Sequence, residues 1–184
     1  MQNNHAIVMK DLTKNFGTVH AVDRLSLEIR KGEVFGMLGP NGAGKTTTVR
    51  MLSALIEPTS GSATVAGYPI TEQAQQVRAR VGILTESPGL YDQLSAEHNL
   101  GFFAEMYDVV DIPAKVEQYL RLLGLWDRRH EAVGGFSNGM RQKLAIARAL
   151  LVEPEILILD ASTSSVDVQT EIRIEEALEE LRAQ

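Results

Sequence analysis

One stretch of this 184-residue chain, residues 39–47, reads Gly39-Pro40-Asn41-Gly42-Ala43-Gly44-Lys45-Thr46-Thr47. It follows the spacing of a phosphate-binding loop, which is Gly, four residues, Gly, Lys and then Ser or Thr. The apolar segment 33–38 before it predicts a buried strand, and residues 47–52 after it predict a helix. The stretch therefore predicts a strand, loop and helix that together hold a nucleoside triphosphate. An ordinary glycine-rich turn is the alternative, which the flanking elements disfavour.

The residue types of this loop suit phosphate groups and a divalent cation. Glycines let backbone N–H groups turn toward phosphate oxygens, and the N-terminus of the following helix adds partial positive charge. We expect the Lys45 ammonium on the β- and γ-phosphates and the Thr46 hydroxyl as a ligand of Mg²⁺. The predicted nucleotide-binding residues of the loop are Gly39, Asn41, Gly42, Gly44, Lys45, Thr46 and Thr47.

The amino-acid composition excludes several classes of protein. The hydrophobic content of 44% suits one globular domain, and the absence of cysteine excludes disulfides and cysteine-ligated metals. A formal net charge of -6 without a cluster of Lys and Arg makes nucleic acid an unexpected partner. The sequence shows no secretion signal and no apolar run of the roughly 18 residues that span a bilayer, so we expect a cytoplasmic chain.

The order of predicted elements indicates an α/β fold. Alternating apolar residues at 25–29 predict an antiparallel strand near the N-terminus, and short strands are expected at 63–66 and 81–84. From 95 to 151 the pattern is helical, with Val116, Tyr119, Leu120 and Leu123 at helical spacing between Pro113 and Gly124. Residues 155–160 predict a buried parallel strand, and residues 174–181 a last amphipathic helix.

Asp160 ends that apolar strand and is the expected partner of the loop. A carboxylate in this place holds Mg²⁺ through water, while the Thr46 hydroxyl ligates it directly. The alternative is a helix cap or turn residue, which is a frequent role of Asp after a strand. The presence of the phosphate-binding loop favours the metal-binding role.

With these motifs in order, the chain resembles the ABC transporter ATPases over almost its whole length. Residues Phe136-Ser137-Asn138-Gly139-Met140 match the place of that family's signature, at the start of a helix upstream of Asp160. The resemblance implies an ABC-type core with an N-terminal antiparallel β subdomain and a helical insertion. It also implies that Ser137 and Gly139 contact the γ-phosphate held by a second ATP-binding domain. A plain capped helix is the alternative.

Three further positions take their roles from the resemblance alone. Phe16 matches the aromatic that stacks on adenine, with a core aromatic as the alternative. Glu86 stands in the loop that usually carries Gln, contacts Mg²⁺ and faces the membrane subunit; with residues 88–91 it resembles the drug- and antibiotic-exporter branch. Asp167 matches the loop that crosses the dimer interface, with an ordinary turn as the alternative.

The chain departs from the family pattern after Asp160. The family normally has Glu next, to polarise the attacking water, whereas here the residue is Ala161, which has no proton acceptor. The four histidines all precede Asp160, so the family's γ-phosphate-sensing His is absent from this sequence. The sequence of residues 160–168 resembles the ATPase part of exporters in which the ATPase is fused to the membrane domain.

These features predict a single, C-terminally incomplete ABC domain over residues 1–184, with its last strands missing. Residues 1–87 and 152–184 are expected to form the α/β core and residues 88–151 the helical subdomain.

The implied function is that of an ATP-binding subunit of an ABC exporter, with ATP and Mg²⁺ as ligands. The implied partners are a separate membrane subunit and a second ATP-binding domain, at the inner face of the cell membrane. The alternative is a hydrolysis-deficient ATP-binding remnant or regulatory module, and whether ATP is turned over stays open. A soluble kinase or GTPase is disfavoured, because no acceptor site or Asn-Lys-x-Asp motif is visible.

Overall fold

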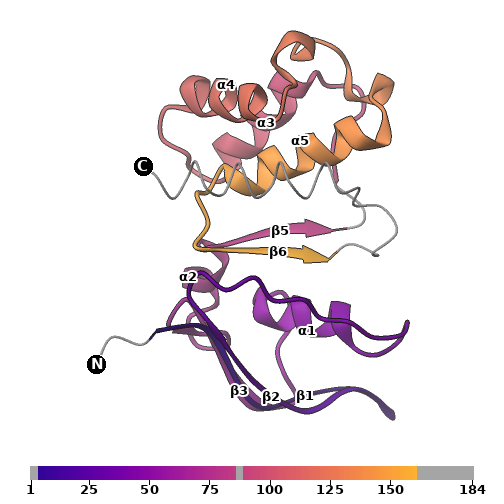
Figure 1. The fold of residues 1–184 in the computed structure, drawn as a ribbon, viewed down its shortest axis with the longest axis vertical. Coiled ribbons are helices and arrows are strands. Elements are labelled where there is room, and N and C mark those ends of the chain that lie inside the picture. The colour runs from indigo at the N-terminus through magenta and orange to yellow at the C-terminus, as the bar shows by residue number, and fades with distance from the viewer. Residues whose placement is uncertain (1–3, 86–88, 161–184) are drawn as a thin grey trace. The chain divides into compact units, whose positions relative to one another are not determined.

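The computed structural model describes residues 4–85 and 89–160 (Figure 1). These residues form two compact units. The first comprises residues 4–83 and 155–160, and the second comprises residues 84–85 and 89–154. The predicted last helix at 174–181 lies outside the described residues, and the predicted single domain stays a prediction.

The first unit is built on an antiparallel sheet of four strands in the order β2-β1-β3-β4. Gly17, with a φ of 59°, lies in the tight connection between the two long strands and adopts the left-handed backbone that favours glycine. The apolar side chains that alternate along β2 face the core, as the sequence predicted. The strands are β1 (His5–Phe16), β2 (Val19–Arg30), β3 (Ser60–Val65) and β4 (Tyr68–Pro69).

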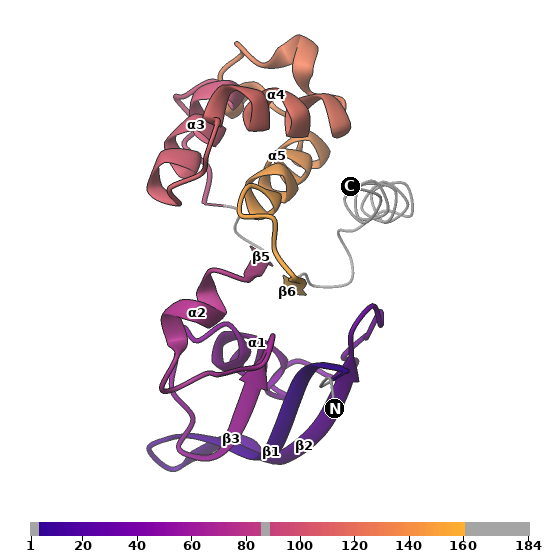
Figure 2. The ribbon, with the colours of Figure 1, turned by 90° about the vertical axis from the view of Figure 1, so that its left-hand side faces the viewer.

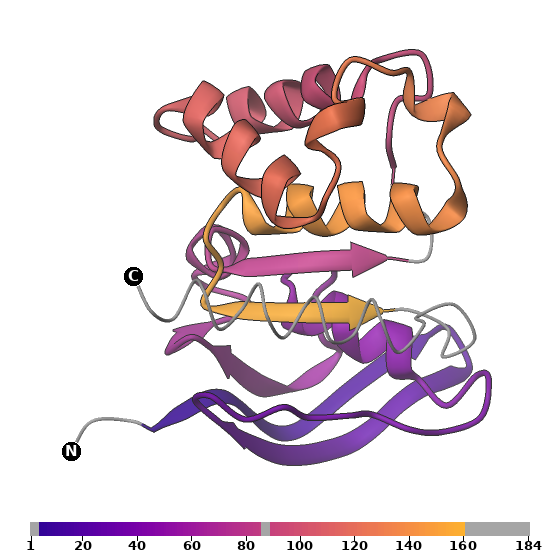
Figure 3. The ribbon, with the colours of Figure 1, turned by 45° about the horizontal axis from the view of Figure 1, so that its top comes forward.

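Helix α1 (Lys45–Leu52) packs on this sheet (Figure 3). Its buried side chains are Thr48, Met51 and Leu52, and the apolar pair joins a core that includes Met9, Leu12, Val65 and Val77. Val77 comes from the short helix α2 (Ala74–Arg78). The first turn of α1 carries the end of the glycine-rich loop, so this packing fixes the direction in which the loop opens.

A second sheet in this part of the chain pairs β5 (Val81–Thr85) with β6 (Ile156–Asp160). The two arrows point the same way in Figure 3, so the strands are parallel. The N–H of Ile156 donates to the carbonyl of Arg80 at 3.1 Å, which sets their register. β6 contacts α1, and Ile156 and Ile158 pack against the core of the first unit.

The predicted buried strand at 33–38 is wrong for this structure. Residues 33–40 have no regular secondary structure, and the side chains of Val34 and Leu38 are 87% and 86% exposed. The physical reason is pairing: among the described residues no strand pairs with this segment, and β6 pairs only with β5. For the same reason β6 is half-buried rather than fully buried, and Leu159 is 41% exposed.

The second unit is helical, as the apolar spacing predicted (Figure 2). It contains α3 (Ala96–Met106), α4 (Ile112–Leu122) and α5 (Asn138–Leu150), with short 3₁₀ turns at Trp126–Arg128 and Val133–Gly135. Pro113 lies in the first turn of α4, and Gly124, with a φ of 67°, follows its end. The fully buried side chains that join the three helices include Leu100, Tyr119, Leu120, Leu144 and Ile146. No described helix has the length and apolarity that a membrane span requires.

Candidate nucleotide-binding site

The glycine-rich loop has a backbone that only glycine accommodates at one position. Gly42 and Gly44 have φ values of 83° and 85°, in the left-handed region. A Cβ atom at Gly44 would lie 2.2 Å from the carbonyl oxygen of Ala21, whereas one at Gly42 would meet nothing within 4 Å. The loop therefore passes close to the backbone of β2, and Gly44 makes this approach possible.

Lys45 begins α1 and reaches back across the loop. Its ammonium donates hydrogen bonds to the carbonyls of Gly39 and Pro40, at 2.6 and 2.8 Å. An ammonium has three N–H donors, so these bonds use two of them and leave the charge beside the loop. The side chain is thus already folded over the residues that are expected to bind phosphate.

Thr48, in the first turn of α1, holds the end of the loop by hydrogen bonds. This role was not predicted from the sequence. The side chain of Thr48 is 2% exposed, and its hydroxyl donates to the carbonyl of Gly44 at 3.0 Å. The backbone N–H of Thr48 donates to the same carbonyl at 2.8 Å. The last glycine of the loop is therefore tied twice to the first turn of α1. A hydroxyl residue two positions after the motif's Thr46 is the signal that could have indicated this role.

Thr46 and Asp160 meet although 114 positions separate them in the sequence. The hydroxyl of Thr46 donates to Oδ1 of Asp160 at 3.1 Å, which joins the start of α1 to the end of β6. Both side chains offer hard oxygen ligands of the kind that Mg²⁺ prefers. Within the described ranges no group of three or more His, Cys, Asp or Glu could hold a metal. The oxygen atoms of Thr46 and Asp160 suit Mg²⁺, which usually takes one or two protein ligands and completes its octahedron with phosphate and water oxygens.

The other predicted nucleotide-binding residues have accessible side chains. Asn41 is exposed, and Thr47 is half-buried in the first turn of α1. Phe16, at the end of β1, is 52% exposed, and its ring centroid lies 5.1 Å from Nζ of Lys14. This exposure contradicts the alternative that Phe16 is a core aromatic. Its role in stacking on adenine stays a prediction.

Ser137 and Gly139 lie at the start of α5 in the second unit. Ser137 is the N-cap, and its hydroxyl accepts a hydrogen bond from the N–H of Met140 at 3.3 Å. Phe136 is buried and anchors the segment, while the residues from Ser137 to Gly139 are exposed. A Cβ at Gly139 would meet nothing within 4 Å, so packing inside the described chain does not require glycine there.

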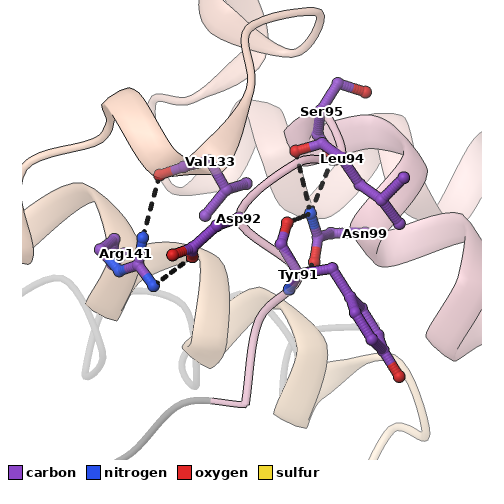
Figure 4. A network of polar contacts seen from close by, with 7 residues as sticks. All are labelled: Tyr91, Asp92, Leu94, Ser95, Asn99, Val133 and Arg141. Atoms are coloured by element: carbon purple, nitrogen blue, oxygen red, sulfur yellow. Dashed lines mark hydrogen bonds and ion pairs between the residues drawn. The ribbon is translucent and has the colours of Figure 1, made fainter.

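A polar network beside this helix start was not predicted from the sequence (Figure 4). The buried side chain of Asn99 accepts from the N–H of Tyr91 at 2.8 Å. Its amide nitrogen lies 2.9, 3.2 and 3.0 Å from the carbonyls of Tyr91, Leu94 and Ser95. Asn99 therefore holds the loop that leads into α3. Its only sequence signal is an Asn among the apolar residues of a predicted helix.

Arg141 completes the network from the first turns of α5. Its guanidinium donates to the carboxylate of Asp92 at 2.6 Å and to the carbonyl of Val133 at 3.1 Å. Asp92 belongs to the loop that Asn99 holds, and Val133 precedes the Ser137 segment. One side chain thus connects both loops to α5.

Three predicted positions lie outside the described residues: Glu86, Ala161 and Asp167. Their expected roles stay predictions.

Comparison with known proteins finds relatives that are named as ATP-binding proteins of transporters. Residues 22–164 match a protein-family model described as ABC transporter. The ABC transporter ATP-binding protein NatA of Bacillus subtilis is 40% identical over 183 residues, which are 96% of this chain and 74% of NatA. The bacitracin transport ATP-binding protein BcrA of Bacillus licheniformis is 43% identical over 157 residues, which are 85% of this chain and 51% of BcrA. The chain therefore spans three quarters of one relative and about half of the other.

Solved structures agree. CbiO1 from Clostridium perfringens, part of the ABC transporter complex cbiONQ, matches with a TM-score of 0.83 and 25% identity, over 98% of this chain and 75% of that one. A second structure, described as the ATP binding subunit of an ABC transporter, matches with a TM-score of 0.83 and 28% identity, over 97% and 75% of the two chains.

Proposed function

Since the chain belongs to the ABC transporter family of ATP-binding proteins, we propose that it binds Mg-ATP at the Lys45 loop as the ATP-binding subunit of an exporter. The observation that carries the proposal is the contact of 3.1 Å between Thr46 and Asp160. It brings the hydroxyl of the loop and the carboxylate of the strand to one place, where the hydroxyl can ligate the Mg²⁺ that accompanies the phosphates and the carboxylate can hold it through water. Lys45 supplies the positive charge beside them.

We propose that ATP binding is retained and that hydrolysis is strongly reduced. Ala161 stands where the family usually has Glu, and a methyl group accepts no proton. A positioned general base contributes roughly 10² to 10⁴ in rate, so its absence slows turnover by that order without removing a phosphate contact. The second candidate function, an ATP-responsive module that does not hydrolyse ATP, rests on this same residue.

The proposed second partner is another ATP-binding domain. The exposed Ser137 and Gly139 carry polar groups on a helix N-terminus that does not need glycine for its own packing. In a head-to-tail pair these groups would meet the γ-phosphate held by the other copy. The Mg²⁺ ligand Glu86 and the interface residue Asp167 are proposed on the resemblance alone.

A membrane subunit of an exporter is the other proposed partner, which would place the chain at the inner face of the cell membrane. The relative named for bacitracin transport supports an exporter. The second unit also exposes several large apolar side chains around α3, of which Phe102 is 42%, Met106 55% and Tyr107 41% exposed. Such a surface suits an amphipathic segment of a partner.

The test is ATP binding by the purified chain, measured by calorimetry with Mg²⁺ and beside it the release of phosphate. We expect binding by the natural chain, loss of binding in Lys45→Ala and phosphate release no faster than in that variant. Ala161→Glu tests the missing base, because a carboxylate there should raise the turnover. Absence of ATP binding by the natural chain would overturn the proposal, and turnover well above the Lys45→Ala rate would contradict the role given to Ala161.

A further inference from the structure

Two loops of the second unit are joined along their backbones just before the Ser137 segment. The N–H of Gly134 donates to the carbonyl of Asp92 at 2.8 Å, and the N–H of Val133 donates to that of Leu94 at 3.0 Å. Ser95 and Ala132 form an antiparallel bridge next to these bonds. A Cβ at Gly134 would lie 3.1 Å from the carbonyl oxygen of Asp92, so glycine permits this close approach. A displacement of residues 91–95 therefore carries residues 132–134 with it.

Arg141 extends this connection to the helix that bears Ser137. Its backbone N–H donates to the carbonyl of Ser137 at 2.9 Å, within the first turn of α5. Its guanidinium holds Asp92 and the carbonyl of Val133 (Figure 4). Only 25% of the Arg141 side chain is exposed, so its position is set by these partners. A path of direct contacts thus runs from Asp92 through Arg141 to Ser137.

The other end of the path reaches the exposed apolar surface around α3. Tyr91 precedes Asp92 and is 47% exposed. Its ring centroid lies 5.2 Å from that of Phe102 and 5.9 Å from that of Phe103. The backbone of Tyr91 is fixed on both sides by Asn99. A partner that contacts this surface would touch the same loop that holds Arg141.

We propose that Asp92, Asn99 and Arg141 are positioning residues that couple the loop at 91–95 to the orientation of Ser137 and Gly139. Asn99 keeps the loop rigid, and the Asp92–Arg141 ion pair transfers its position to the start of α5. The proposal rests on the proposed function, in which these two residues close on ATP held by a second copy. It adds the means by which a contact at the apolar surface alters that closure.

The experiment exchanges the charges of the ion pair in the full chain. The variants are Asp92→Lys, Arg141→Glu and the two combined, and the readout is the protein concentration at which Mg-ATP drives half of the chain into dimers. Each single variant should raise this concentration by about two- to fivefold, the equivalent of an exposed ion pair. The combined variant restores an ion pair of opposite polarity but not the bond to the Val133 carbonyl, so its value should lie between those of the single variants and that of the natural chain.

Two controls separate positioning from general stability. ATP affinity of the monomer should be unchanged in all three variants, because the Lys45 loop is not altered. The comparison pair is Glu117 and Arg121 on α4, whose side chains bond at 2.7 Å. Its carboxylate residue is 46% exposed, against 59% for Asp92, and its Arg is 56% exposed, against 25% for Arg141. Charge exchange at that pair should leave the dimerisation unchanged. Unchanged dimerisation in the Asp92 and Arg141 single variants, or no rescue in the combined variant, would overturn the proposal.

A second readout tests, independently of dimerisation, whether the Asp92–Arg141 ion pair positions the start of α5. Amide hydrogen exchange of residues 137–141 should be about two- to fivefold faster in each single variant and slower again in the combined variant than in either single one. If the natural chain binds ATP without forming dimers, the dimer part of the proposed function is wrong, and this exchange still tests the coupling. Equal exchange rates at 137–141 in the natural chain and the single variants would show that the ion pair does not position Ser137.

Discussion

Two glycines with nearly the same backbone conformation should differ in how much stability and ATP affinity an alanine substitution costs. Gly44 has a φ of 85° and faces the carbonyl of Ala21, whereas Gly42 has a φ of 83° and open space around it. Gly42→Ala should therefore cost only the left-handed penalty, about 1–2 kcal/mol at most. Gly44→Ala adds a contact with backbone that must move, so we expect a further loss of about 1–3 kcal/mol. We also expect ATP affinity to fall at least tenfold more in Gly44→Ala.

Thermal unfolding and ATP titration of the two variants measure this difference. Equal affinities in Gly42→Ala and Gly44→Ala would show that the approach to Ala21 does not shape the loop.

Tyr119 places a pH-sensitive group in the core of the second unit. Its side chain is fully buried, and its hydroxyl has no hydrogen-bond partner within the described residues. Burial, and to a smaller extent the negative charge of Glu153, raises the pKa of Tyr119 to about 12. The folded chain thus favours the neutral phenol, and the stability this group contributes is fully present below about pH 10. It is lost as the pH rises from 10 through 12.

Tyr119→Phe should remove this dependence. The variant loses no hydrogen bond and no longer buries an unpaired hydroxyl, so at pH 7 its free energy of unfolding should be equal to the natural value or up to about 1 kcal/mol higher. Between pH 10 and 11 it should lose less stability than the natural chain. Urea unfolding at pH 7, 10 and 11 measures this, and parallel losses in the two proteins would contradict the assignment to Tyr119.

At the scale of elements, two helices begin with the same kind of cap and differ in proposed role. Ser95 caps α3 and Ser137 caps α5, with hydroxyls that accept from His98 N–H at 3.2 Å and Met140 N–H at 3.3 Å. Alanine at either position should lower the free energy of unfolding by about 1 kcal/mol. Ser137→Ala should also weaken the ATP-driven dimer, because this hydroxyl is proposed to meet phosphate. Ser95→Ala should not, because Asn99 holds the loop through the backbone carbonyl of Ser95, which the substitution keeps.

Denaturant unfolding and sedimentation with Mg-ATP separate the two effects. If Ser95→Ala weakens the dimer as much as Ser137→Ala does, the phosphate contact of Ser137 is not supported.

Helices with local causes are the elements that a sequence pattern predicts most directly. The helix α4 follows from the spacing of Val116, Tyr119 and Leu120 and from Pro113 at its start, all of which act within one helix. The segment 33–38 has equally apolar residues, but a strand needs a neighbour, and pairing is decided by the whole sheet. A sequence pattern alone therefore overestimates the order and burial of such a segment.

The residues of the candidate site likewise fall into those that the sequence predicts and those that it does not. The sequence predicts that Thr46 and Asp160 lie close together, because a phosphate-binding loop and a strand-ending carboxylate imply a shared cation. The structure confirms their contact. Asn99 and Arg141 were missed because their partners are backbone carbonyls and a loop carboxylate, whose positions depend on how the loops fold. Motif chemistry predicts the groups that touch a ligand better than it predicts the groups that hold them in place.

For the whole molecule, the two units should respond differently to Mg-ATP. Ligand at about 100 times its dissociation constant stabilises the residues that bind it by about 2.7 kcal/mol. The Lys45 loop, α1 and the end of β6 carry the proposed ATP contacts, so their amides should exchange more slowly at any protein concentration. The start of α5 carries the proposed contact to a second copy, so its amides should be protected only where the chain forms dimers.

Amide hydrogen exchange at a low and a high protein concentration measures both effects in one sample series. Lys45→Ala should show neither, because it removes the charge that holds the phosphates. Protection of residues 137–141 that is independent of protein concentration would contradict a contact in a dimer, since a contact within one chain does not depend on a second copy. Protection of α5 without protection of α1 would place ATP elsewhere than at the Lys45 loop.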